Sequence, residues 1–132
     1  MVTILRDVSV NLPIAGVWER LRQVGKAHEL FAGVLVDGRT EGDLRTVTFA
    51  NGMVVTEQIL GVDEPSMRVA YSVVDGPFAR HAASMQVIAD GAASRVVWFS
   101  DFKPDALSEM VTPLMEAGLA ALKRNLEGGS AD

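Results

Sequence analysis

The feature that most constrains the fold is an amphipathic stretch near the C-terminal end of the sequence. Between residues 105 and 127, apolar residues recur at spacings of three and four, as they do along one side of an α-helix. They are Leu107, Met110, Val111, Leu114, Leu119, Leu122 and Leu126. We therefore predict one long helix whose apolar side lies on the rest of the protein. Pro113 predicts either a kink in this helix or a restart capped by Thr112.

The middle of the chain has the pattern of short strands. Turn residues such as Asn51-Gly52 and Asp90-Gly91 separate six extended segments, at 34–39, 44–50, 53–62, 67–74, 80–89 and 94–103. Consecutive strands with such short connections pair antiparallel. A further strand at 3–12 precedes two short helices at 13–24 and 26–31, and Pro13 suits the first turn of the earlier helix.

Composition limits the classes of function. The chain has 132 residues, of which 48% are hydrophobic and 22% charged, and this predicts one globular domain over 1–132 with a tail at 128–132. Its net charge of −5 and scattered basic residues argue against a nucleic-acid partner. With no cysteine and two histidines, we expect no metal site and no cofactor. No apolar run is long enough to span a membrane, so we expect a cytoplasmic protein without stable membrane association.

Several segments together suggest a family. They are Asn11-Leu12-Pro13 leading into Val17-Trp18-Glu19-Arg20-Leu21, Leu44-Arg45-Thr46-Val47-Thr48-Phe49 before Asn51-Gly52, Thr56-Glu57-Gln58-Ile59-Leu60, Arg95-Val96-Val97-Trp98, and Ala117-Gly118-Leu119-Ala120-Ala121-Leu122-Lys123. With the order of elements, they resemble the polyketide cyclase/dehydrase branch of the START-like (SRPBCC) superfamily, over residues 3–127.

The resemblance implies an α+β helix-grip fold of the START-like or Bet v 1-like kind. In such a fold a seven-stranded antiparallel sheet curves around the long C-terminal helix, and the two short helices after the first strand close one end of a deep cavity. Similar proteins hold sterols, lipids, quinones, aromatic polyketides or plant hormones. Some of them are enzymes and many are carriers, so the fold does not choose between binding and catalysis.

The apolar face of each strand predicts which side chains point inward, because side chains alternate across a strand. The predicted inward sets are Val69, Tyr71 and Val73; His81, Ala83, Met85 and Val87; and Val96, Trp98, Ser100 and Phe102. Phe99 is the clearest exception, since it is a large apolar residue on the predicted outer face.

The turn near residue 50 allows two strand registers. A two-residue turn, Asn51-Gly52, would place Arg45 opposite Gln58, whereas a three-residue loop with Gly52 in the left-handed conformation would place Arg45 opposite Glu57. We prefer the second register because it pairs opposite charges. The pair would then mark a polar point in the cavity, because an isolated buried charge is costly. The alternative is an ion pair on the solvent face, worth less than about 1 kcal/mol.

Nine residues form the predicted ligand cavity: Arg45, Val47, Glu57, Tyr71, His81, Met85, Trp98, Met110 and Leu114. No catalytic residue is assigned, and His81 and Glu57 are the weak candidates. A lone histidine beside a cavity is more often structural than catalytic. His28, in the second short helix, is expected to be exposed.

These observations support three functions, in order of preference. The first is binding of a small hydrophobic or aromatic molecule with one polar end. The second is a cyclase, dehydratase or hydrolase that uses His81, Glu57, Arg45 or Tyr71 for proton transfer. The third is a scaffold whose cavity has collapsed around residues such as Met85 and Trp98. The expected partner is a small hydrophobic molecule, and a homodimer is left open.

Overall fold

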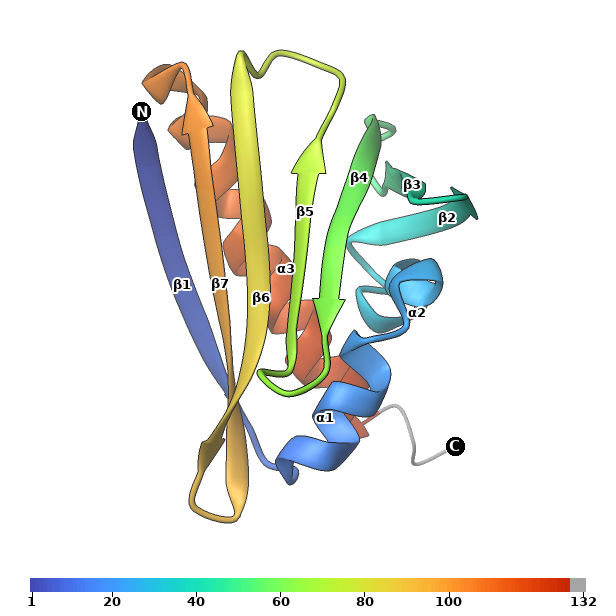
Figure 1. The fold of residues 1–132 in the computed structure, drawn as a ribbon, viewed down its shortest axis with the longest axis vertical. Helices are drawn as coiled ribbons and strands as arrows, with labels where there is room; N and C mark the ends of the chain where they lie inside the picture. The colour runs from blue at the N-terminus through green and yellow to red at the C-terminus, as the bar shows by residue number, and fades with distance from the viewer. Residues whose placement is uncertain (129–132) are drawn as a thin grey trace.

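The computed structural model describes residues 1–128, in which a seven-stranded antiparallel sheet curves around one long helix (Figure 1). The predicted helix-grip fold is therefore confirmed. The sheet order is β1-β7-β6-β5-β4-β3-β2. The strands are β1 (Val2–Val10), β2 (Leu35–Glu41), β3 (Leu44–Phe49), β4 (Val54–Asp63), β5 (Arg68–Val73), β6 (Arg80–Asp90) and β7 (Ala93–Lys103). The α-helices are α1 (Ile14–Leu21), α2 (Ala27–Leu30) and α3 (Ser108–Gly128), and the short 3₁₀ helices are η1 (Val24–Lys26) and η2 (Asp105–Leu107).

Pro113 does not divide the C-terminal helix. The helix α3 runs from Ser108 to Gly128 with Pro113 inside it, so the alternative of a restart at Thr112 is wrong. Proline removes one backbone hydrogen bond, and here it does so in the second turn, close to the helix start. The predicted tail at 128–132 lies outside the described residues except for Gly128, which belongs to α3.

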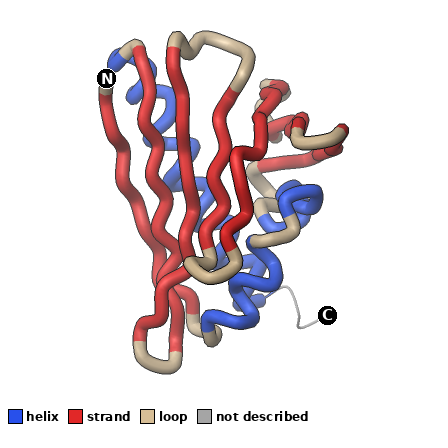
Figure 2. Tube along the Cα trace, viewed as in Figure 1, coloured by secondary structure: helices blue, strands red, loops and turns tan. Residues whose placement is uncertain are grey.

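Two irregularities in strand pairing accompany the curvature of the sheet. The register shifts in β2 between Leu35 and Asp37, and in β4 between Ile59 and Gly61. An extra residue in one strand bends it and increases its local twist. In Figure 2, β2 and β3 turn away from the direction of the other strands, so that the sheet has a concave side. The helix α3 lies along the sheet and contacts β1 most extensively.

Polar side chains connect the C-terminal part of α3 to β1 and to the end of α2. Lys123 donates a hydrogen bond from Nζ to the carbonyl oxygen of Ser9 at 2.7 Å, at the open edge of β1. Asn125 donates from Nδ2 to the carbonyl oxygens of Leu30 and Ala32, at 2.8 and 3.0 Å. These bonds satisfy a strand edge and the end of α2 at the same time.

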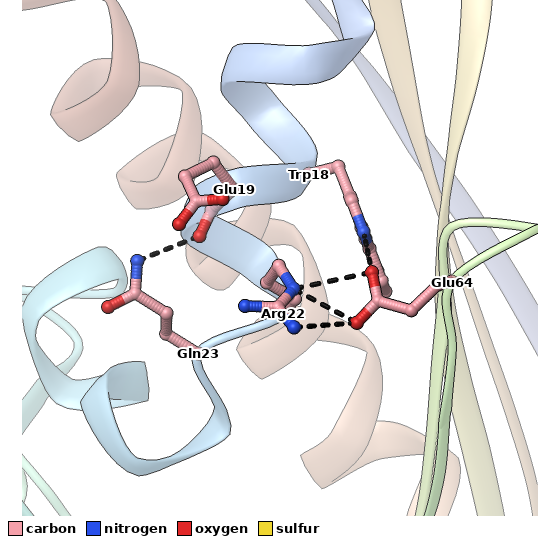
Figure 3. A network of polar contacts seen from close by, with 5 residues as sticks. All are labelled: Trp18, Glu19, Arg22, Gln23 and Glu64. Carbon is pink, nitrogen blue, oxygen red and sulfur yellow. Dashed lines mark hydrogen bonds and ion pairs between the residues drawn. The ribbon is translucent and has the colours of Figure 1, made fainter.

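A second set of polar contacts fixes α1 to the turn between β4 and β5 (Figure 3). Trp18 donates its indole N–H to Glu64 Oε1 at 2.7 Å. Arg22 donates to both oxygens of the same carboxylate, with Nη2 2.7 Å from Oε2. These hydrogen bonds lower the pKa of the Glu64 carboxyl group. The carboxylate of Glu64 therefore holds the first helix against the sheet.

Candidate functional site

A cavity of about 220 Å³ lies between the concave side of the sheet and α3. All nine residues of the predicted set line it. The exposed residues Val54, Asp75 and Pro77 also line it, so the cavity reaches the surface beside the β3–β4 turn and the β5–β6 loop. A role of these side chains in holding a ligand remains a prediction.

The hairpin between β3 and β4 has the three-residue loop that the charge pattern favoured. Arg45 is paired with Glu57, and the amide N–H of Phe49 donates to the carbonyl oxygen of Met53 at 2.8 Å. Gly52 has a φ of +93°, a region that favours glycine. The predicted register is therefore confirmed.

Arg45 and Glu57 form a largely buried ion pair on the cavity wall. Arg45 Nε donates to Glu57 Oε1 at 2.9 Å, and Nη2 lies 2.8 Å from the same oxygen. Each side chain is only 11% exposed, which contradicts the alternative of an ion pair on the solvent face. Arg45 also donates from Nη1 to the carbonyl oxygen of Val24 at 3.1 Å, and its guanidinium carbon lies 5.5 Å from the centre of the Tyr71 ring.

The second oxygen of Glu57 has a different environment. Nε and Nη2 of Arg45 both approach Oε1, and Oε2 accepts no hydrogen bond from the described part of the chain. Within residues 1–128, the only fully enclosed side-chain nitrogen or oxygen without a partner is His28 Nδ1, so Glu57 Oε2 faces open space. Burial raises the pKa of the Glu57 carboxyl, and the positive charge of Arg45 opposes this rise.

Tyr71 and Trp98 are joined across the sheet. Trp98 on β7 donates its indole N–H to the Tyr71 hydroxyl on β5 at 3.1 Å, although β6 lies between the two strands. Tyr71 is 6% exposed, and burial raises the pKa of its hydroxyl, which therefore stays protonated at neutral pH. Because the oxygen already accepts a hydrogen bond, its own proton is available to a hydrogen-bond acceptor.

The imidazole of His81 is held in one tautomer. The β5–β6 pairing ends at Tyr71 and Ala83, and beyond this point the amide N–H of Val73 donates to His81 Nδ1 at 3.0 Å. Nδ1 is therefore an acceptor, and the neutral ring carries its proton on Nε2, which lies 3.4 Å from Ser100 Oγ. Burial lowers the pKa of His81 to about 4. A neutral ring protonated on Nε2 is a hydrogen-bond donor at that atom and not a base.

Sequence reasoning missed two features of this region. Asp75 is absent from the predicted set of site residues, but it lines the cavity and accepts a hydrogen bond from the amide N–H of Thr56 at 3.0 Å. His28 was expected to be exposed, but its side chain is half-buried because the ring packs against the backbone of Gly38. The signal for this contact was a glycine inside a strand, which can mark a close approach of another group.

Residues 1–128 contain no group of three or more histidine, aspartate or glutamate side chains arranged to hold a metal ion. None of the helices in this range combines the length and the apolar character needed to cross a membrane.

Comparisons with known proteins give the family and the fold. A family model described as polyketide cyclase / dehydrase and lipid transport matches residues 1–127. No curated protein matches the chain by sequence. An uncharacterized protein from Bacillus thuringiensis has a similar structure, with a TM-score of 0.84 at 18% identity over 95% of this chain and 98% of that chain.

Two solved structures with named activities are also similar. The di-domain ARO/CYC protein BexL of the BE-7585A biosynthetic pathway has a TM-score of 0.84 at 16% identity, over 100% of this chain and 48% of that chain. A point mutant of norcoclaurine synthase from Thalictrum flavum has a TM-score of 0.72 at 16% identity, over 95% and 93%. At such identities the likeness establishes the shared fold and no activity.

Proposed function

Because the chain belongs to the polyketide cyclase/dehydrase and lipid transport family, we propose that it binds a small hydrophobic or aromatic molecule between the sheet and α3. The observation that carries this proposal is the cavity of about 220 Å³ with a mostly apolar wall and a few polar groups. Ligand sites in proteins commonly have this composition, since apolar walls supply affinity and polar groups fix orientation.

The energetic cost of an empty cavity supports the proposal. At about 24 cal/mol per Å³, a dry void of this volume would cost about 5 kcal/mol, which is comparable with the whole stability of a small domain. A cavity of this size is therefore expected to hold either a guest or water. Arg45, Glu57 and Tyr71 offer the hydrogen bonds that water needs when no guest is present.

The experiment measures the binding of naphthalene, used as an apolar probe, by isothermal titration calorimetry. Leu114→Trp places a large ring on the cavity wall and should abolish binding. Ala117→Trp adds the same ring at an exposed position of the same helix and should leave binding unchanged. Equal binding by the two variants, or no binding by the unmodified protein, would contradict the proposal.

An enzymatic role, as a cyclase or dehydratase, is the second candidate. It is favoured by the open Oε2 of Glu57 and the available proton of Tyr71, because a carboxylate and an acid on one wall can support proton transfer. The tautomer of His81 argues against this residue as the base. Loss of turnover of a candidate β-ketone substrate in Glu57→Gln, with binding retained, would support this role, and unchanged turnover would contradict it.

The scaffold alternative and the expected location, oligomeric state and partners also stay proposals. A scaffold with a collapsed cavity ranks third, because Met85, Trp98 and Met110 line the open cavity instead of filling it. A cytoplasmic location, a monomer or homodimer, and the lack of nucleic-acid or stable membrane binding stay predictions, and fractionation and sedimentation of the protein at its natural abundance can check them.

A further inference from the structure

The cavity wall contains one arginine, but its charge is already paired with a carboxylate of the protein. A lone arginine would favour a carboxylate guest, such as a fatty acid. In this cavity, however, Arg45 is already paired with Glu57 and also bonded to the carbonyl oxygen of Val24. Its positive charge is therefore not free to bind a second anion without breaking these contacts.

Two carboxylates and one guanidinium line the cavity. Glu57 lies on β4 within the wall, and Asp75 lies in the β5–β6 loop at the surface. With His81 neutral, the formal charge of the described lining is −1. An anionic guest would be repelled by both carboxylates, and the repulsion from the buried Glu57 is screened less by solvent than that from the exposed Asp75.

Glu57 also provides a hydrogen-bond acceptor within the cavity wall. The residue is 8% exposed, its Oε1 is occupied by Arg45, and its Oε2 faces open space without a protein partner. A buried acceptor is satisfied either by water or by a donor on the guest, and an acceptor that carries charge forms the stronger hydrogen bonds.

From these observations we propose that the cavity selects neutral guests with a hydrogen-bond donor, such as a phenol or alcohol, and rejects carboxylates, with Glu57 as the residue that sets this selectivity. The inference rests on the proposed binding function. The apolar wall would hold the body of the guest, and Glu57 Oε2 would accept a hydrogen bond from its hydroxyl group.

The test compares four probes with one ring system on the full chain by calorimetry: naphthalene, 2-naphthol, 2-methoxynaphthalene and 2-naphthoate. At about pH 8 the probe 2-naphthoate is ionised. There 2-naphthol should bind at least about tenfold more tightly than naphthalene and 2-methoxynaphthalene, as a hydrogen bond to the ion-paired Glu57 carboxylate predicts. The anion 2-naphthoate should bind at least about tenfold more weakly than 2-naphthol.

Variants assign the selectivity to Glu57. In Glu57→Gln, the advantage of 2-naphthol should fall and the penalty on 2-naphthoate should largely disappear. Glu116→Gln makes the same chemical change at an exposed glutamate paired with Arg6, and it should leave the order of the probes unchanged. If both variants behave alike, the assignment to Glu57 is wrong.

The outcomes separate this inference from the function on which it rests. If naphthalene does not bind, the binding function itself fails. If naphthalene binds but 2-naphthol and 2-methoxynaphthalene bind equally, or 2-naphthoate binds most tightly, only the selectivity is wrong. This comparison uses the unmodified protein, so it decides the question even if Glu57→Gln does not fold.

Discussion

Arg45 and Glu57 lie directly opposite each other on β3 and β4, and their ion pair is the only one within residues 1–128 in which both side chains are largely buried. The pair stands on the wall of a cavity whose other sides are mostly apolar. A buried pair of charges contributes little net stability, because the loss of hydration offsets the attraction, but a broken pair is costly. We therefore expect this ion pair to matter more for the properties of the cavity than for the stability of the fold.

Removal of one member of this pair should destabilise the protein far more than replacement of both. Arg45→Met alone leaves Glu57 buried and uncompensated, and the expected loss is about 3–5 kcal/mol of unfolding free energy. The double variant Arg45→Met/Glu57→Leu should lose much less. Urea denaturation of the two singles and the double measures this coupling, and additive losses would contradict the buried pair.

Two glycine-to-alanine substitutions should have opposite effects on stability. Gly52 has a positive φ in the β3–β4 turn, so Gly52→Ala should cost about 1 kcal/mol or more. Gly16 lies in α1 with open space around it, so Gly16→Ala should stabilise by up to about 1 kcal/mol. Thermal denaturation compares them, and a neutral Gly52→Ala would argue against the three-residue loop.

The contact between His28 and Gly38 should appear as an energetic coupling. A Cβ atom at position 38 would lie 2.7 Å from His28 Nδ1, so Gly38→Ala forces the imidazole ring or the strand to move and should cost about 1–3 kcal/mol. In a His28→Ala background the same change meets no ring and should cost little. A double-mutant cycle that shows no coupling would mean that the ring does not pack on this strand.

His81 should make stability depend on pH in the acidic range. Its pKa is about 4 in the folded protein against an ordinary value of 6.5, so the unfolded chain binds the proton more readily. The stability that depends on the neutral ring is fully present above about pH 6.5 and is lost as the pH falls toward 4. Because the ring is only half-buried and solvent screens its charge, the loss should stay well below the roughly 3 kcal/mol that the full shift would give.

His81→Asn can still accept the Val73 N–H and does not titrate, and it should lose this part of the pH dependence. NMR titration of the ring protons in the unmodified protein should give the low pKa directly. A ring that titrates near 6.5 would show that burial does not disfavour its charged form.

The sequence predicted the architecture because its signals are local. The apolar spacing of 105–127 predicted the long helix, although its first three residues form the separate 3₁₀ helix η2 and α3 begins at Ser108. Turn residues delimited the strands to within one or two residues. One long-range feature was also predictable: the paired charges of Arg45 and Glu57, together with Gly52, selected the register that places both side chains on the cavity wall.

The details of the site depend on contacts between segments that are distant in sequence. The tautomer of His81 follows from the point at which β5 stops pairing with β6. The residue types at this point do not predict where the pairing ends. The bond from Trp98 to Tyr71 joins β7 to β5 across the intervening β6, so it depends on how three strands lie in the sheet and not on the pattern of any one of them. The burial of His28 depends on a glycine ten residues away on another element.

A crystal structure of the protein grown with 2-naphthol would show directly where a guest lies and which groups it contacts. We expect the naphthyl ring between the sheet and α3, in contact with Trp98 and Met110, with its hydroxyl within hydrogen-bond distance of Glu57 Oε2. A structure in which the compound lies on the outer surface, while the cavity holds only water or has closed, would contradict this expectation.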